Sequence, residues 1–271
     1  MSFLSASYEF VQLIILHASF SQIKEDLMFK SIVPISKESH GTKKIKPISS
    51  YAFAANTHLA SIMVHEFYRA ASMYPIVFLE DKEHDDFRPV ILLGLEPNEN
   101  LFIDANGKWT VSYIPAIIRR YPFALAKTPE DNKYTVCIDE ESDLVSEEEG
   151  EPLFDEKGEP TKVIENVKKY LGELQQMDAL TSQFTKMLKE KNMFTPLNMR
   201  VREADTVRNV TGCYVINEQR LNNLSDETFL DLKKKSLLAP IYSHLVSLGQ
   251  IERLFSLKKK KAGAGPVNTI Q

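Results

Sequence analysis

The sequence has few of the features that mark a membrane protein, a disulfide-stabilised protein or a nucleic-acid-binding protein. Only two of its 271 residues are cysteines, Cys137 and Cys213, which provides no disulfide framework and no CxxC metal knuckle. No run approaches the roughly 20 apolar residues that a membrane-spanning helix needs. The net charge is −4, so no basic field exists to attract nucleic acid or an anionic membrane. These absences favour a cytoplasmic protein in which thiols stay reduced.

Motifs of well-known enzyme classes are also missing. The chain has no GxSxG nucleophile elbow, no P-loop, no GxGxxG and no SxxK motif. The apolar stretch VQLIILHASF near the start has no basic region before it, and no small-residue cleavage pattern follows, so a secretory signal is not predicted. The sequence therefore neither identifies a catalytic residue nor specifies a cofactor.

The first half of the chain has the pattern of a β-rich domain. The segments 75–81 and 87–96 are short apolar runs separated by a polar turn, and 122–128 and 134–140 form a second pair. Asn106-Gly107 supplies the backbone freedom that a tight hairpin turn needs. Because the connections are too short for parallel crossovers, we expect a mainly antiparallel sheet.

Helical patterns dominate the second half. The residues 161–192 repeat apolar side chains every three or four positions, with Pro160 as the first residue of a long amphipathic helix. Ser225 is a good N-cap, and residues 237–257 predict a last amphipathic helix. A further helix is expected over 49–75. The fold class predicted is α+β, with the long helix and the helical C-terminal part packed on the sheet.

The two ends of the chain have separate interpretations. Lys24-Glu25-Asp26 can be encoded by a bacterial ribosome-binding sequence, one codon before Met28. We therefore expect translation to start at Met28, with residues 1–27 a mis-assigned extension. A short amphipathic extension is the alternative. A single domain is predicted over 28–256, followed by a disordered basic and glycine-containing tail at 257–271.

Histidines are candidate metal ligands or bases. His58 and His65 lie seven residues apart, which would place them near one face of the expected helix. Metal-binding pairs on one helix usually lie four apart, as in HExxH, so a structural or surface role is favoured and no metal site is predicted. His244 is expected on a polar helix face, and His40 in a solvated basic loop.

The sequence IIRRYPF offers a candidate anion-binding site at the end of a short helix between prolines. Arg119 and Arg120 can hold a carboxylate or phosphate, with Tyr121 and Phe123 as an apolar wall. The favoured alternative is that the arginines pair with the acidic stretch while the aromatic rings belong to the core.

The stretch 137–160 is crowded with carboxylates. A calcium loop of the EF-hand type needs oxygen ligands at alternating positions and a glycine at the sixth, and this sequence lacks both the glycine and a ligand at Val145. Solvated turns are the favoured interpretation. The sharper one is that Asp139, Glu140 and Asp143, at the end of a strand, face a partner or a cation.

An ordered series of motifs across residues 28–256 resembles the SapC family, named from bacterial surface-array (S-layer) loci. The motifs are VPISKESH, YAFAANTHL, PIVFLE, NLFIDANGKW, YIPAIIRRYPFAL, CIDEESDLV, EPLFDEKGEPT and LSDETFLDLKKKSLLAPIYSHLVSLGQIERL. The resemblance implies a soluble protein whose relatives are associated with surface-array loci and with genes for outer-membrane receptors and flavin-dependent halogenase-like proteins. It also supports Met28 as the start and supplies no catalytic residues. The peptide-transport permease and the saposin that share the name do not fit this sequence.

Three functions remain open from the sequence. The first is an accessory or binding protein for a peptide or protein in cell-surface biogenesis or uptake. The second is a peptide- or small-molecule-modifying enzyme with a metal or organic cofactor, in which His58, His65, Arg119 or Asp139 converge on one pocket. The third is a structural or regulatory module with an exposed apolar stripe on the helix over 161–192 and self-association. The oligomeric state is not specified.

Overall fold

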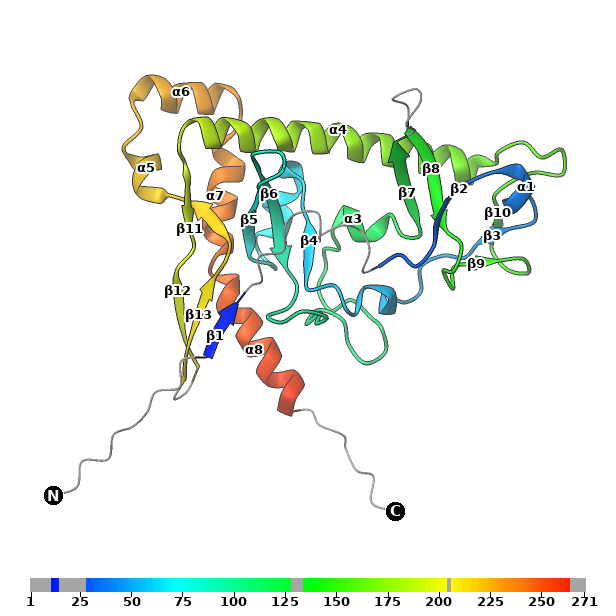
Figure 1. The fold of residues 1–271 in the computed structure, drawn as a ribbon, viewed down its shortest axis with the longest axis horizontal. Coiled ribbons are helices and arrows are strands. Elements are labelled where there is room, and N and C mark those ends of the chain that lie inside the picture. Colours follow the sequence, from blue (N-terminus) through cyan, green and yellow to red (C-terminus); the bar gives the residue numbers. More distant parts are fainter. Residues whose placement is uncertain (1–10, 15–27, 128–133, 204–205, 264–271) are drawn as a thin grey trace, which may run out of the picture.

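The computed structural model describes residues 11–14, 28–127, 134–203 and 206–263, which mix helices and strands (Figure 1). The strands are β1 (Val11–Ile14), β2 (Ile32–Pro34), β3 (Lys44–Ile45), β4 (Leu59–Ser61), β5 (Ile76–Asp81), β6 (Asp86–Leu92), β7 (Phe123–Lys127), β8 (Tyr134–Asp139), β9 (Val145–Ser146), β10 (Glu151–Pro152), β11 (Phe194–Pro196), β12 (Met199–Glu203), β13 (Thr206–Thr211) and β14 (Tyr214–Ile216). The helices are α1 (Lys37–His40), η3 (Ala52–Ala54), η4 (Val64–Glu66), α2 (Phe67–Ala70), α3 (Ala116–Arg119), α4 (Lys162–Glu190), α5 (Glu218–Asn222), α6 (Asp226–Lys234), α7 (Leu238–Ser247) and α8 (Gln250–Gly263), where η marks a 3-10 helix. The α+β class predicted from the sequence is confirmed.

Among the described residues, the strands form one five-stranded sheet and three sheets of three strands. The five-stranded sheet has the order β11-β14-β5-β6-β4 and is antiparallel throughout. A second antiparallel sheet has the order β2-β8-β7, and a small one has the order β10-β3-β9. In the remaining sheet, β1-β13-β12, the pair of β1 with β13 is parallel. The mainly antiparallel first half is thus confirmed.

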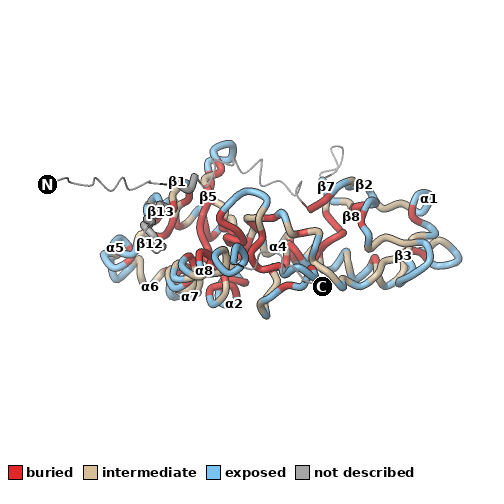
Figure 2. The backbone as a smooth tube through the Cα atoms, turned by 90° about the horizontal axis from the view of Figure 1, so that it is seen from below, coloured by how far each residue is buried: buried red, intermediate tan, exposed pale blue. Residues whose placement is uncertain are grey.

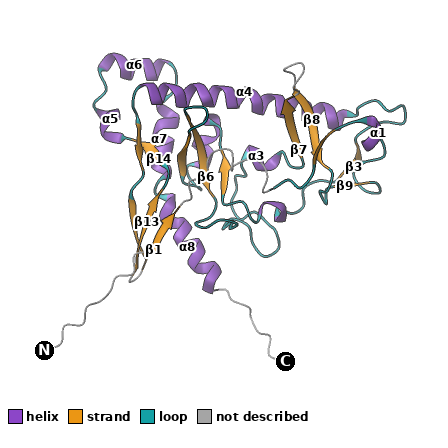
Figure 3. Cartoon of the chain, in the orientation of Figure 1, coloured by secondary structure: helices purple, strands orange, loops and turns teal. Residues whose placement is uncertain are grey.

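Helix α4 runs along the molecule and passes over both main sheets (Figures 1 and 3). Its first half buries Ile164 and Leu171 near β7 and β8, and its second half buries Phe184 against β6 and η4. The long helix predicted over 161–192 is confirmed, although it begins at Lys162 behind the N-cap Thr161 rather than at Pro160. This helix therefore connects two parts of the interior.

The interior contains two clusters of buried apolar side chains. The large core surrounds the five-stranded sheet and the helices α7 and α8, and includes the fully buried Phe67, Tyr74 and Phe78. The small core lies between the β7–β8 pair and α4, and includes Phe123 and Ile138. In Figure 2, buried backbone follows the β5 region most densely. Two unequal cores bridged by one helix leave room between the sheets for cavities.

The prediction of a single helix over 49–75 is wrong. The segment instead folds as η3, β4, η4 and α2. Strand β4 pairs with the edge of β6, which takes the backbone groups of Leu59–Ser61 into the sheet. The Glu66 carboxylate then accepts the Met63 N–H at 3.0 Å and starts a separate turn. Several sides of this segment are buried, so apolar residues occur at many of its positions. Some of them fall at helical spacing by chance, and the sequence pattern alone then resembles a helix with one buried face.

The single C-terminal helix expected over 237–257 is divided in two. Helix α7 ends at Ser247, and α8 begins at Gln250 after Gly249. Ser247 Oγ accepts the Ile76 N–H at 3.0 Å, which fixes the end of α7 against β5. The predicted N-cap at Ser225 is confirmed, because its side chain accepts the Thr228 N–H.

The structure describes only some of the residues at the two ends of the chain for which predictions were made from the sequence. Helix α8 continues to Gly263, so residues 257–263, expected to be disordered, are helical instead. Residues 264–271 lie outside the described part of the chain. Of residues 1–27, only Val11–Ile14 are described, and they pair with β13. The start at Met28 stays a prediction.

Candidate functional site

Two neighbouring cavities follow α4. Cavity A is lined by α4, β4 with the residues after it, β6, α3, β7 and β8. Cavity B is lined by α4, the segment 45–48, the segment 119–123 and Leu144. Each has a volume of about 310 Å³. Arg120 and Leu171 line both and form the wall between them. Together the cavities make the best-supported binding site in the described part of the chain.

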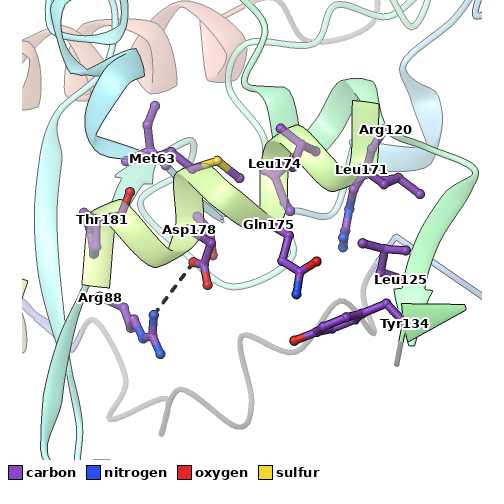
Figure 4. A pocket seen from close by; sticks show the side chains of 14 residues that line it. Met63, Arg88, Arg120, Leu125, Tyr134, Leu171, Leu174, Gln175, Asp178 and Thr181 are labelled. Carbon is purple, nitrogen blue, oxygen red and sulfur yellow. Dashed lines mark ion pairs between the residues drawn. The ribbon is translucent and has the colours of Figure 1, made fainter. Parts of the chain in front are cut away.

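Cavity A lies between the edge strands of two sheets. Strand β4 is the last strand of the five-stranded sheet, and β7 is the last strand of the β2-β8-β7 sheet. Ser61 of β4 and Leu125 of β7 both line the cavity, and α4 passes over the gap. Its apolar surface comes mainly from Met63, Leu125, Leu171 and Leu174 (Figure 4). Such a surface suits apolar side chains of a ligand.

Polar side chains stand at one side of cavity A. The guanidinium of Arg88 lies 3.7 Å from the carboxylate of Asp178 (Figure 4). The Asp178 side chain is 64% exposed and that of Arg88 21%, so this ion pair faces solvent at the carboxylate side. Gln175 lies nearby on α4, and Tyr134 projects from β8 with half its surface exposed. These groups can bond to the backbone or polar side chains of a bound molecule.

Cavity B contains the whole RRYPF segment singled out in the sequence. Arg119 Nε donates to the Ile114 carbonyl at 3.0 Å, and its guanidinium carbon lies 5.8 Å from the Tyr170 ring centroid. The Tyr170 hydroxyl donates to the Ala116 carbonyl at 3.1 Å, and burial raises the pKa of Tyr170. Phe123 also lines cavity B and adds apolar surface to it. The arginine at 119 is therefore held in place over an aromatic ring.

The adjacent Arg120 and Tyr121 are largely buried. Arg120 is 8% exposed, and its guanidinium carbon lies 5.5 Å from the Phe29 ring centroid. The Tyr121 ring stacks on Phe53 at a centroid distance of 4.0 Å. Its hydroxyl donates to Asp139 at 3.3 Å, and burial raises the pKa of Tyr121. The aromatic rings thus have the core position that the sequence favoured, and anion binding by the arginines stays a prediction.

Asp139 departs from the solvated turns favoured for the acidic stretch. Its side chain is fully buried, and its carboxylate accepts the N–H groups of Lys30 (3.0 Å), Ser31 (2.9 Å) and Glu141 (3.3 Å). These bonds tie the approach to β2 to the end of β8. A carboxylate that uses its oxygens on backbone donors is a structural element rather than a cation ligand. The solvated interpretation fails at Asp139 because two of its donors, Lys30 and Ser31, lie more than 100 residues away in sequence.

Glu140 and Asp143 are exposed, and neither lines cavity A or cavity B. Glu140 accepts a weak hydrogen bond from the Ser31 hydroxyl at 3.4 Å. Of the three acidic candidates, only Asp139 is linked to the cavities, through Tyr121. The acidic stretch therefore contributes Leu144 to cavity B, but none of its carboxylates lines either cavity.

His58 and His65 do not share a helix. His58 comes directly before β4 and is half-buried, so that burial lowers its pKa, while His65 is exposed on η4. Neither lines either cavity. Their expected proximity on one face depended on the helix over 49–75, which the structure does not contain. The convergence of His58, His65, Arg119 and Asp139 on one pocket is not observed.

The two remaining histidines that the sequence placed near solvent are buried. His244 Nε2 accepts the Ile216 N–H at 3.0 Å, so the proton lies on Nδ1, which donates to the Ile76 carbonyl at 2.9 Å. Burial lowers the pKa of His244 to about 3. His40 is 1% exposed, with Nδ1 3.2 Å from the Ser36 nitrogen. Both are structural side chains, contrary to expectation.

Glu66 is a buried carboxylate that the sequence interpretation missed. It accepts the Ala116 N–H at 2.9 Å and the Tyr113 hydroxyl, in addition to the Met63 N–H. It thereby holds α3 next to η4, and so positions the arginines that follow. Burial and the neighbouring carboxylate raise the pKa of Tyr113. The bond of Glu66 to the Met63 N–H is the half of a capping box that the glutamate supplies, but the Met at position 63 gives no capping-box signature in the sequence.

The described residues provide no alternative metal or membrane site. Among them, no group of three or more His, Cys, Asp or Glu side chains is arranged to hold a metal ion. Within the same ranges, no helix has the length and apolarity to cross a membrane. The apolar face of α4 is also mostly buried, with Leu180 as an exposed exception, so the exposed stripe of the third hypothesis is not found.

Comparison with known proteins places the chain in one family and gives no closer relative. No curated protein and no solved structure matches the chain. The family model described as SapC matches residues 35–254, which include every element from α1 to α7 and all lining residues of both cavities. The chain therefore belongs to the SapC family.

Proposed function

We propose that this protein binds a peptide segment or a partner protein in bacterial cell-surface (S-layer) biogenesis or uptake. The observation that supports binding is the pair of adjoining cavities along α4, with apolar walls and charged or polar rims. The cell-surface context comes from the resemblance described above. We place the binding in the cytoplasm, which is compatible with two cysteines that are buried and form no disulfide with each other.

Several features favour a peptide over a compact small molecule. Arg120 and Leu171 separate the cavities, so a ligand that fills both must extend across these two side chains. An extended chain does so easily, because its side chains project at intervals. Strand β7 ends its sheet beside cavity A and becomes exposed from Ala126 onward, and such a sheet edge can bond to the backbone of an extended peptide.

The enzyme hypothesis has less support. Its candidate histidines lie away from both cavities, and Asp139 already accepts three backbone N–H groups. Binding chemistry is thus better supplied than acid–base chemistry at this site.

A photo-crosslinking experiment tests the proposed function. A photoreactive amino acid replaces Gln175 at the edge of cavity A in the full chain, produced in a bacterium that naturally encodes it. We expect a crosslink to a defined surface or secreted polypeptide, identified by mass spectrometry. The same amino acid at Lys233, exposed on α6, should not give this product.

A substitution in the cavity supplies the matched control. Leu125→Glu introduces a charge into the apolar part of cavity A at a half-buried edge position, and should abolish the crosslink from Gln175. Leu230→Glu makes the same change at a 48% exposed position on α6 and should leave it intact. A crosslink that survives Leu125→Glu, or no surface polypeptide at all, would contradict the proposal.

A further inference from the structure

We propose that the two cavities select an acidic peptide: an extended segment with a carboxylate side chain between apolar residues. This inference rests on the proposed peptide-binding function and specifies the chemistry that the site recognises. It is supported by the charges that line the cavities, by their apolar walls and by their spacing along α4.

The cavities carry a charge opposite to that of the whole chain. The charged side chains lining them are Lys46, Arg88, Arg119, Arg120 and Asp178, four cations against one anion. The chain as a whole has a net charge of −4. A local excess of positive charge in an acidic protein favours an anionic ligand, because partly enclosed charges interact more strongly than those in water.

The arrangement of these cations fits a carboxylate near the wall between the cavities. Arg120 lines both cavities, Arg119 lines cavity B and Arg88 lines cavity A. A ligand that spans the wall therefore meets a guanidinium-bearing side chain in each cavity and at the wall itself. Guanidinium groups match the planar carboxylate through paired N–H donors.

Apolar contacts flank that position. Val167 lines cavity B and Leu174 lines cavity A. They are two turns apart on α4, a rise of about 10 Å. About three residues of an extended chain cover this distance. One bound segment can thus place an apolar side chain in each cavity and an acidic side chain between them.

Selection from a display library tests this inference without assuming a partner. The full chain is used to select from random nine-residue peptides, and enriched sequences are measured by fluorescence anisotropy. We expect enriched peptides to contain Asp or Glu between apolar residues. Replacing that residue by Asn or Gln should weaken binding about tenfold, and raising the salt concentration should reduce the difference.

Variants of exposed or half-buried cavity residues provide the sharpest readout, because they disturb the fold least. Asp178→Asn removes the anion from cavity A and should tighten binding of the acidic peptide about threefold. Gln175→Glu adds an anion to cavity A and should weaken it by a similar factor. Arg88→Gln should weaken it further. Lys234→Gln, an equal change of charge on exposed α6, should have no effect.

The possible outcomes separate the two proposals. Enriched peptides without acidic residues, or binding indifferent to Asp178→Asn and Gln175→Glu, would overturn the acidic specificity and leave peptide binding in place. No enrichment of any peptide would overturn the proposed function itself. Competition by dodecanoate, a carboxylate on a single alkyl chain, at concentrations comparable with the peptide would show that a small amphiphile occupies the cavities instead.

Discussion

The five-stranded sheet and the β2-β8-β7 sheet use their buried polar groups in different ways. In the large core, His244 and Ser247 bond inward to the backbone of β5 and β14, so polar atoms close the interior. Beside the smaller sheet, Asp139 bonds to the backbone in the same way, but the buried Arg120 and the exposed Arg119 border cavities. A filled interior has no space for a ligand, whereas a cavity lined by side chains can admit one. The difference suggests that the large core provides most of the stability and the junction of the two sheets provides the binding surface.

The largest expected effect separates the two cores by stability. Phe78→Ala empties a fully buried ring position in the large core and should lower the free energy of unfolding by about 3–5 kcal/mol. Val136→Ala removes two methyl groups from the small core, at 8% exposure, and should cost about 1–2 kcal/mol. Urea unfolding measures both. Equal losses would remove the proposed inequality between the cores.

The next effect tests how the smaller sheet is held together. Asp139→Asn replaces an oxygen that accepts backbone N–H groups by an amide NH₂, which cannot accept them, and should cost about 2–3 kcal/mol. Glu140→Gln changes an exposed neighbour with the same loss of charge and should be within about 0.5 kcal/mol of the parent. Chemical denaturation at pH 7 compares them. A cost at Glu140 as large as that at Asp139 would argue against the structural role assigned to Asp139.

A pH effect should be confined to the large core. The pKa of His244 is lowered by burial from 6.5 to about 3, so between these values the unfolded chain binds a proton that the folded chain does not. Stability is therefore complete above pH 6.5 and declines as the pH falls, by up to about 1.4 kcal/mol per pH unit. Unfolding at pH 7.0, 6.0 and 5.0 measures the slope before most carboxylates titrate.

Matched histidine variants identify the residue responsible for that slope. His244→Asn can keep one donor and one acceptor, so it should fold with reduced stability and a flatter dependence between pH 7 and pH 5. His58→Asn should remove a smaller part of the pH dependence of stability, since burial also lowers the pKa of the half-buried His58. His65→Asn, at an exposed position, should leave the slope unchanged. A parental slope in His244→Asn would contradict its assignment.

The accuracy of the sequence predictions follows the range of the interactions involved. Strands β5 and β6, the helix closed before Pro122 and the cap at Ser225 depend on neighbours in sequence, and all were predicted correctly. Arg119, Arg120 and Tyr121 come together because they are adjacent. The Ser31 and Lys30 donors to Asp139 lie 108 and 109 residues away, so its burial left no local signal.

The errors have the same cause. Segment 49–75 has a helical period, but pairing with β6 decides its structure. The ion pair of Arg88 with Asp178 joins side chains 90 positions apart, and cavity A collects residues from six parts of the chain. A site formed between two sheets is a tertiary property, and one sequence without its fold shows only the segments that contribute to it.

The smallest expected effect concerns α4 where it joins the two cores. Gly172 lies next to Leu171, the residue shared by both cavities, and a Cβ placed there meets no heavy atom within 4 Å. Gly172→Ala should therefore raise the free energy of unfolding by about 0.5–1 kcal/mol, because alanine loses less backbone entropy in a helix. Gly94→Ala is the contrasting change. The new Cβ would lie 2.2 Å from the Glu99 carbonyl oxygen, so this substitution should destabilise the protein. If Gly172→Ala is destabilising instead, the binding site requires a flexible α4, and peptide affinity should then fall together with stability.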